Sequence, residues 1–142
     1  MSGKQAHKVS NKTVRVMVVD DREEVRESIG TLLSLQDDIE VVGEAGNGPQ
    51  AVEEARKLNP TLILMDVVMP TPDGKKFDGL DACRVIKREG LASAVIALTV
   101  HTDHATYQRA QQVGCAMVLD KGVLPEELVR RVRLVGASTA II

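Results

Sequence analysis

Residues 62–70 read LILMDVVMP, and this stretch is the most informative part of the sequence for the architecture. Residues 62–65 form a continuous apolar run rather than an alternating one, which is typical of a strand buried on both faces of a sheet. Asp66 follows directly, so a carboxylate stands where a buried strand ends. In open parallel sheets, ligands bind at the carboxyl ends of the strands. We therefore expect a functional site at this edge if the remaining chain builds such a sheet.

The remaining chain alternates short apolar runs with longer amphipathic segments. The other expected strands are residues 14–19, 39–42, 94–98 and 117–119. These runs are also apolar rather than alternating, so we expect each strand to be buried on both faces. The expected helices are residues 23–35, 50–58, 80–87 and 103–113, and a last helix from Pro125 through Val135. Within residues 23–35, for example, apolar side chains recur at the spacing of one helix face. Five strand–helix units imply an α/β fold, a doubly wound five-stranded parallel sheet with helices on both faces.

The composition bounds the class of protein. The chain has 142 residues, of which 44% are hydrophobic and 27% charged, as expected for one globular domain. Phe77 and Tyr107 are the only aromatic residues, and the net charge is −2, so we expect no direct nucleic-acid contact. The sequence has no N-terminal signal and no apolar run of about 18 residues, which predicts a cytoplasmic protein without membrane contact.

Cysteine and histidine usage argues against a structural metal. Cys83 and Cys115 lie far apart and form no C-x-x-C motif, which fits a reducing cytosol. His101 and His104 have the spacing of two ligands on one helix, but a third partner is missing. We therefore expect both histidines to be solvated.

Polar residues follow four of the five expected strands. These residues are Asp20, Asp21, Asp66, Thr99 and Lys121. A single aspartate after a strand is usually a helix cap or turn residue, but capping does not explain five such groups at one edge. Three carboxylates repel one another, and one lysine is insufficient to neutralise them. Mg²⁺ suits a site with few carboxylates and several waters, and it neutralises phosphate oxygens during phosphoryl transfer. A carboxylate beside the metal can then act as a nucleophile toward phosphorus.

At this point the chain resembles the receiver domains of two-component response regulators, which have a flavodoxin-like or CheY-like (βα)5 fold. The resemblance covers roughly residues 13–135. It is carried by VMVVDD (16–21), LILMDVVMP (62–70), DGLDACRVIK (78–87), VIALT (95–99) and DKG (120–122). VVGEAGNGPQAVEEARKLNP (41–60) and LPEELVRRVR (124–133) look closest to the subgroup that precedes a LuxR/NarL-type helix-turn-helix output domain. Any one motif is weak, whereas their order and spacing together are specific.

The resemblance implies a role for each residue of the cluster. Asp66 would be the phosphoacceptor. Asp20, Asp21, Asp66 and the backbone carbonyl of Val68 would hold Mg²⁺, with Mn²⁺ as a substitute. Thr99 would be the switch hydroxyl, and Lys121 would contact the phosphoryl group. The resemblance implies no binding site for an organic cofactor, and no catalysis beyond the domain's own phosphorylation and dephosphorylation.

The resemblance also implies partners and domain limits. The phosphoryl group would come from a histidine kinase or phosphotransfer protein. The signalling surface, made by the fourth helix, fifth strand and fifth helix, would form a homodimer and control transcription through an output domain. We expect a flexible tail at residues 1–12, the receiver domain at 13–136, and a tail or linker stub at 137–142.

Three features depart from the family pattern. Residues 71–77 are an insertion where most relatives have about two residues. The insertion either gates access of the phosphodonor or contacts a partner, or it is a tolerated surface addition. Val100 stands where the family usually has Ala or Gly, and it is expected to narrow the path to Asp66. Val118 stands where many receivers have Tyr or Phe, so the switch lacks that aromatic rotamer change.

Two functional alternatives remain open. The domain would be either an interaction module that is rarely or never phosphorylated, or a stand-alone phosphorelay carrier. Two other classes of protein are excluded. A haloacid-dehalogenase-type phosphatase needs a second aspartate two residues after the first, where Val68 stands. A dinucleotide-binding domain needs a glycine-rich turn after the first strand, where Asp20 and Asp21 stand.

Overall fold

Five parallel strands form one sheet in the order β2-β1-β3-β4-β5. The computed structural model describes residues 13–140, with side chains as far as residue 138. The strands are β1 (Val14–Val19), β2 (Ile39–Ala45), β3 (Leu62–Asp66), β4 (Ala94–Thr99) and β5 (Met117–Asp120). The helices are α2 (Glu23–Ser34), α3 (Gly48–Leu58), α4 (Gly79–Arg88), α5 (His104–Val113) and α6 (Pro125–Ala140). Strands and helices alternate along the described chain, which confirms the predicted doubly wound α/β fold.

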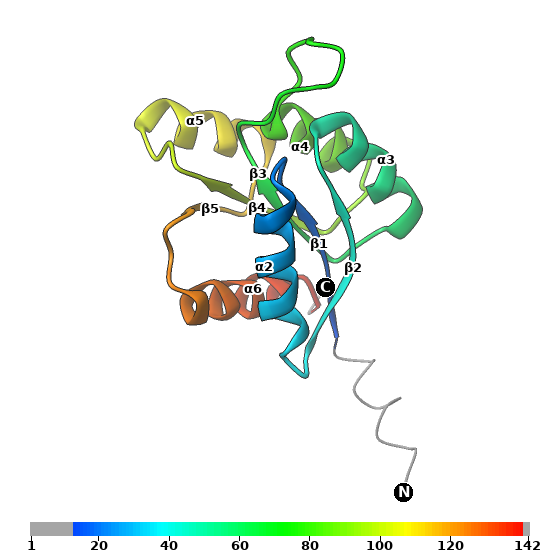
Figure 1. Ribbon diagram of the computed structural model, residues 1–142, viewed down its shortest axis with the longest axis vertical. Coiled ribbons are helices and arrows are strands. Elements are labelled where there is room, and N and C mark those ends of the chain that lie inside the picture. Colours follow the sequence, from blue (N-terminus) through cyan, green and yellow to red (C-terminus); the bar gives the residue numbers. More distant parts are fainter. Residues whose placement is uncertain (1–12, 141–142) are drawn as a thin grey trace, which may run out of the picture.

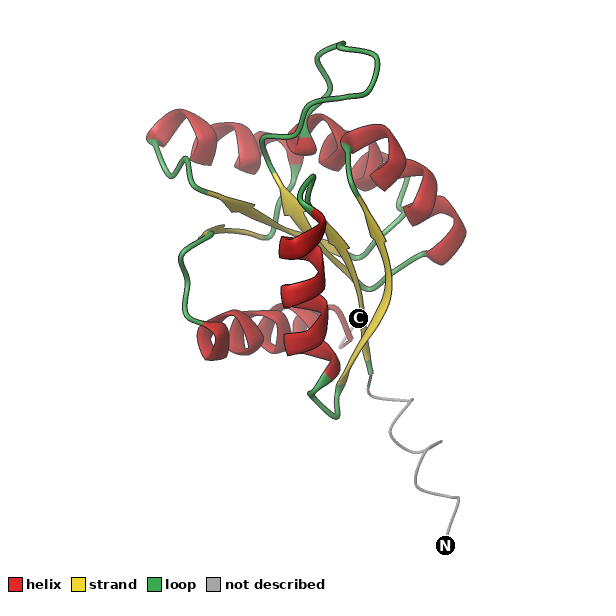
Figure 2. Ribbon diagram, in the orientation of Figure 1, coloured by secondary structure: helices red, strands yellow, loops and turns green. Residues whose placement is uncertain are grey.

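The helices form two layers around the sheet (Figure 1). Helices α2 and α6 lie on one face, and α3, α4 and α5 lie on the other (Figure 2). Each face has its own apolar core. Leu33 of α2 and Val132 of α6 contribute to one core, and Ala51 of α3 and Ile86 of α4 contribute to the other. The two cores meet opposite sides of the same strands, because successive strand residues point to opposite faces.

Burial follows the position of each strand in the sheet. Every residue of the central strands β3 and β4 is buried, and β1 is buried except for Arg15. The expectation of complete burial was wrong for the edge strands β2 and β5, which contain exposed or partly exposed positions. An edge strand has a neighbour on one side only, so helices cover it less completely.

Local chemistry fixes where α4 begins and where α5 ends. The Asp78 carboxylate accepts hydrogen bonds from the backbone N–H groups of Leu80 and Asp81, and the Asp81 carboxylate accepts one from the Asp78 N–H. This reciprocal arrangement is a capping box, and it satisfies backbone donors that would otherwise be unpaired. Gly114 ends α5 with a φ of 95°, a conformation that glycine adopts without steric cost.

The last helix continues further than its apolar pattern predicts. Helix α6 runs through Gly136 to Ala140, so residues 137–140 of the expected tail are helical. At Gly136 the helix passes close to β1, because an added Cβ would lie 2.7 Å from Cγ2 of Val14. A glycine therefore lets the helix continue against the sheet. The expected N-terminal tail, residues 1–12, lies outside the described residues.

No helix within residues 13–140 has the length and apolar character needed to cross a membrane.

Candidate functional site

The carboxyl edge of the sheet brings together the polar residues that follow the strands. Asp20 directly follows β1, Asp66 and Thr99 are the last residues of β3 and β4, and Lys121 directly follows β5. Strands β1, β3, β4 and β5 are consecutive neighbours in the sheet, so their ends lie side by side. The predicted convergence therefore results from parallel pairing alone.

Three carboxylates form one acidic cluster. Asp20, Asp21 and Asp66 each offer a carboxylate oxygen, and these oxygens lie within 4.8 Å of one another. Asp20 and Asp66 are only 1% and 5% exposed, whereas Asp21 is exposed. Two of the three charges are thus largely removed from water, while the third keeps the cluster open to solvent.

Lys121 is shared between the two buried carboxylates. Its Nζ lies 2.6 Å from Oδ2 of Asp20 and 3.4 Å from Oδ2 of Asp66. Burial opposes the charged form of Lys121, but the hydrogen bond to Asp20 and the charge of Asp66 outweigh it, so its pKa is raised. Lys121 therefore stays a full positive charge at the site.

The electrostatic balance of the cluster remains negative. Burial and the nearby charge of Asp20 raise the pKa of Asp66 from 3.8 to about 6, although Lys121 opposes the shift. One ammonium cannot neutralise three carboxylates, so the raised pKa of Asp66 reflects its burial first and the uncompensated charge of Asp20 second. Clustered carboxylate oxygens are the donors that hard divalent cations such as Mg²⁺ prefer. The donor set therefore fits a metal ion.

Asp20 is held in place by groups that sequence reasoning missed. Its Oδ1 accepts a hydrogen bond from the backbone N–H of Arg22 at 2.9 Å. Its backbone carbonyl accepts one from Nη1 of Arg26 at 2.7 Å, and Nε of Arg26 donates to the Glu44 carboxylate at 2.7 Å. The signal that could have indicated this role is an arginine one turn into the helix that follows the acidic pair. Arg26 fixes the loop that carries both aspartates.

Thr99 is buried beside Lys121. Its hydroxyl oxygen accepts a hydrogen bond from the backbone N–H of His101 at 2.9 Å, and its carbonyl oxygen accepts one from the Lys121 N–H at 3.0 Å. Because the hydroxyl accepts there, its own proton can be donated to another group. Only 1% of Thr99 is exposed, so this donor is positioned by packing.

The loop after Asp66 packs tightly at its far end. The Gly79 N–H donates to the Val67 carbonyl at 2.9 Å, and a Cβ at Gly79 would overlap the Asp66 carbonyl oxygen. Only glycine allows α4 to begin so close to the β3 end. Val68 lies in this loop with a side chain that is 56% exposed. The predicted use of its backbone carbonyl as a metal ligand stays a prediction.

The insertion, residues 71–77, projects from the carboxyl edge between β3 and α4 (Figure 1). A turn closes its tip, with the Gly74 N–H donating to the Thr71 carbonyl at 3.1 Å. Phe77 at its base is partly buried and packs against the core beneath α3, α4 and α5. At Gly48 a Cβ would lie 2.8 Å from the Phe77 ring. The insertion therefore has an exposed tip and an anchored base.

Arg109 of α5 contacts the start of α4 next to the insertion, and no motif in the sequence indicates this contact. Its guanidinium donates to both carboxylate oxygens of Asp78 at 2.7 and 2.8 Å, and to Asp81 at 3.1 Å. Burial opposes ionisation of Asp78, but the Arg109 hydrogen bonds hold the pKa of that carboxyl below its ordinary value. Charge-assisted bidentate pairs are among the stronger hydrogen bonds. Arg109 thus ties α5 to the beginning of α4.

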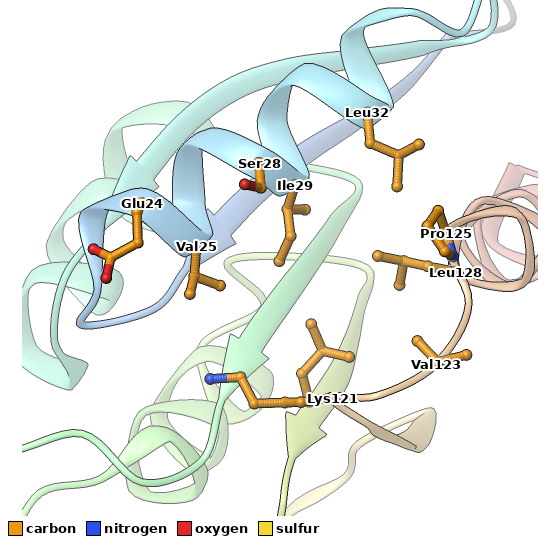
Figure 3. A pocket seen from close by; sticks show the side chains of 10 residues that line it. Glu24, Val25, Ser28, Ile29, Leu32, Lys121, Val123, Pro125 and Leu128 are labelled. Carbon is orange, nitrogen blue, oxygen red and sulfur yellow. The ribbon is translucent and has the colours of Figure 1, made fainter.

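An apolar groove of about 390 Å³ opens beside the cluster. Figure 3 shows Val25, Ile29 and Leu32 of α2 facing the segment that joins β5 to α6. Leu128 of α6 contributes to the opposite wall, and Lys121 lies at one end of the groove. A partner side chain in this groove would therefore lie next to a residue of the acidic site.

The structure also places the other residues that the sequence singled out. His101 and His104 are exposed, as predicted. Val100 is 66% exposed, and Val118 is partly buried against the core on the α3, α4 and α5 face. Their predicted effects on access and switching remain predictions. The sequence predicts no contact between Cys83 and Cys115, but their sulfur atoms lie 3.4 Å apart.

Comparison with known proteins gives one consistent result. The sequence profile of the response regulator receiver domain matches residues 16–133. The response regulator GacA of Pseudomonas viridiflava is 38% identical over 125 residues, which are 88% of this chain and 56% of GacA. UvrY of Escherichia coli is 38% identical over 122 residues, 86% of this chain and 54% of UvrY. The chain thus spans about half the length of these regulators.

Solved structures agree with the sequence matches. A signal receiver domain from Mycobacterium tuberculosis, assigned to the response regulator NarL, superposes with a TM-score of 0.80 at 31% identity. This superposition covers 89% of this chain and 98% of that domain. A LuxR-family two-component response regulator from Aurantimonas gives a TM-score of 0.78 at 29% identity, covering 89% of this chain and 86% of that one.

Proposed function

The chain belongs to the response-regulator receiver family, and from this membership we propose that it is a phosphorylation switch whose phosphoryl group is accepted by Asp66. The observation that carries the proposal is the shared contact of Lys121 with Asp20 and Asp66 beside the exposed Asp21. This arrangement joins a nucleophilic carboxylate, a metal-binding pair and a cation that can hold a phosphoryl oxygen.

Asp66 has the properties of the acceptor. Its pKa of about 6 leaves the carboxylate mostly ionised at neutral pH, so it can act as a nucleophile. A carboxylate oxygen of Asp66 forms a bond to phosphorus while the bond between phosphorus and the donor's imidazole nitrogen breaks. The electron pair of that bond stays on the nitrogen. The product is an acyl phosphate on a residue at the end of a buried strand.

The surrounding residues stabilise the transferred group. Asp20, Asp21, Asp66 and the Val68 carbonyl would hold Mg²⁺, for which Mn²⁺ can substitute. When bound, the ion supplies positive charge to the phosphoryl oxygens. Lys121 pairs with one phosphoryl oxygen, and the Thr99 hydroxyl donates to another.

The apolar groove supports a protein as the phosphodonor. A histidine kinase or phosphotransfer protein that places an amphipathic helix against α2 would bury apolar surface there and bring its phosphohistidine toward Lys121. Substituting Ile29→Glu places a charge in the groove. It should slow labelling by an autophosphorylated histidine kinase that labels the wild type, while labelling by acetyl phosphate is unchanged.

The output is proposed from the relatives. The aligned residues make up only 56% and 54% of the regulators GacA and UvrY, which leaves room in them for an output domain. We propose that phosphorylation changes the face made by α5, β5 and α6, that this face forms a homodimer, and that the switch controls transcription through an output domain. Cytoplasmic localisation follows from the same role.

A phosphorylation assay tests the proposal. After incubation with acetyl phosphate and Mg²⁺, the intact wild-type mass should increase by one phosphoryl group, and EDTA should prevent the increase. Asp66→Asn should gain none, whereas the exposed insertion variant Asp73→Asn should behave like the wild type. Modification of Asp66→Asn would show that the acceptor is another residue. If the wild type is never modified, the protein is an interaction module with a receiver fold.

A further inference from the structure

Two cysteines that are 32 positions apart in the sequence meet on the α3, α4 and α5 face of the sheet. The Sγ atoms of Cys83 and Cys115 lie 3.4 Å apart. Cys83 belongs to α4, and Cys115 lies in the short connection between α5 and β5. The chain has no other cysteine, so neither thiol has a competing partner within the same molecule.

The environment of the pair favours reaction between these two sulfurs. Cys83 is fully buried, whereas Cys115 is partly exposed, so a small oxidant can reach the pair from the α5–β5 side. Lys87, one turn after Cys83, adds positive potential near both sulfurs. A disulfide needs the sulfurs about 2.05 Å apart, so the pair must approach by roughly 1.4 Å.

The pKa shifts of the two thiols also favour a reaction between these sulfurs. The hydrogen bond with the Cys115 thiol and the charge of Lys87 lower the pKa of Cys83, against the opposing effect of burial. The pKa of Cys115 is raised, because loss of its proton would remove that hydrogen bond. The thiolate is the reactive form of cysteine, so the lowered pKa of Cys83 favours ionisation of this sulfur over that of Cys115.

We propose that Cys83 and Cys115 are an oxidative modification site, at which a hydroperoxide converts the two thiols into a reversible intrachain disulfide. One sulfur, as thiolate, attacks the outer oxygen of the hydroperoxide, and the O–O bond breaks to release an alcohol or water. The second sulfur then attacks the resulting sulfenic acid, forms the S–S bond and displaces water. In total, two thiols and one hydroperoxide give one disulfide, one alcohol and one water.

The disulfide would constrain a defined part of the fold. It would join α4 to the start of β5 and enclose β4 and α5 in one covalent loop. A loop of this length restricts the unfolded chain, so a disulfide that fits the native geometry should raise the melting temperature, by about 5–10 °C. A disulfide that forms only by distorting the backbone would lower the melting temperature instead.

Mass spectrometry of the oxidised chain tests the proposal. The reduced 142-residue protein is treated with hydrogen peroxide, then denatured and alkylated. We expect the intact protein to be lighter by two hydrogen atoms and to accept no alkyl group, whereas the untreated protein accepts two. Trypsin should release the peptide of residues 77–84 linked to that of residues 110–121, because Lys76, Arg84, Arg109 and Lys121 bound them. Dithiothreitol should restore both thiols and the lower melting temperature.

Single variants separate the intrachain bond from general thiol oxidation. Cys115→Ala changes a partly exposed residue, and its remaining thiol should form only a sulfenic acid or a disulfide between molecules. Cys83→Ala should behave in the same way, and Cys115→Ala carries the test if Cys83→Ala fails to fold. The proposal is overturned if peroxide leaves both wild-type thiols free to be alkylated. It is equally overturned if peroxide adds oxygen atoms without linking the two peptides, or if dithiothreitol does not restore the two thiols.

Discussion

The Lys121 ammonium lies closer to Asp20, at 2.6 Å, than to the proposed acceptor Asp66, at 3.4 Å. Before phosphorylation Lys121 therefore compensates mainly the most buried carboxylate of the cluster. A phosphoryl group on Asp66 offers Lys121 a more highly charged partner, so the lysine can move between two partners without leaving the site. Its removal should be costly for folding and for phosphorylation.

We expect Lys121→Met to lower the free energy of unfolding by about 3 kcal/mol in EDTA, because it leaves Asp20 and Asp66 buried without their positive partner. Mg²⁺ should recover part of this loss by supplying another counter-charge. Urea denaturation with and without Mg²⁺ measures both effects. Lys76→Met, in the exposed part of the insertion, is the matched control and should change stability by less than about 0.5 kcal/mol. Equal effects of the two substitutions would exclude an electrostatic role for Lys121.

The raised pKa of Asp66 predicts a specific dependence of stability on pH. Its folded-state pKa of about 6 lies above the ordinary value of 3.8. The stabilising contribution of the protonated carboxyl is therefore complete below about pH 4 and is lost as the pH rises through about 6. In EDTA, Asp66→Asn should be more stable than the wild type at about pH 7.5, by roughly 2 kcal/mol, and this gain should shrink toward pH 4.

Chemical denaturation of both proteins across this pH range measures the difference. Asp73→Asn serves as the control, because Asp73 is exposed and its pKa is lowered by the backbone N–H of Lys75. A constant difference between wild type and Asp66→Asn at every pH would contradict the burial of an ionised Asp66.

Gly79 should tolerate no side chain. A Cβ there would overlap the backbone of Asp66, so Gly79→Ala must displace either the start of α4 or the acceptor itself. We expect a loss of about 2–4 kcal/mol in stability and slower labelling by acetyl phosphate. Gly30→Ala is the control, because an added Cβ in the middle of α2 meets nothing within 4 Å. It should be neutral or stabilising by up to about 1 kcal/mol. A benign Gly79→Ala would show that the acceptor loop is less tightly packed than described.

The insertion should divide into a dispensable tip and a structural base. Removing residues 72–76 should leave the melting temperature within a few degrees, because exposed turns add little closure entropy. Phe77→Ala should cost about 1–3 kcal/mol, because its partly buried ring packs against the core. Thermal unfolding of the two variants makes the comparison. A large loss from the deletion alone would show that the tip is structural.

The sequence predicts the site well where the order of strands and helices along the chain determines which residues lie together. Buried strands were recognised as continuous apolar runs, and parallel pairing then placed Asp20, Asp66, Thr99 and Lys121 at one edge. The expected helix 103–113 agrees with α5, because local chemistry sets both ends: the Asp103 side chain accepts a hydrogen bond from the Thr106 N–H, and Gly114 ends the helix. Each of these features depends either on a few neighbouring residues or on the rule that parallel strands end at the same edge of the sheet.

The missed features all depend on tertiary contacts between separate elements of the fold. Arg109 of α5 reaches Asp78 at the start of α4, and Cys83 of α4 meets Cys115 in the connection between α5 and β5. Neither contact has a periodicity or a motif, because the distance between two helices is set by the side chains of the whole layer. The continuation of α6 past Gly136 was missed for a related reason, since the close approach to Val14 is a tertiary contact.

Chemical trapping of the phosphorylated residue tests most directly whether Asp66 is the acceptor. Borohydride reduces an acyl phosphate to an alcohol, so a phosphorylated aspartate becomes homoserine and is located by peptide mass spectrometry. After treatment with acetyl phosphate, Mg²⁺ and borohydride, we expect homoserine at position 66 and aspartate at positions 20, 21 and 73. Homoserine at position 20 or 21 with an unmodified Asp66, or a phosphoryl group found on His101 or His104, would contradict this expectation.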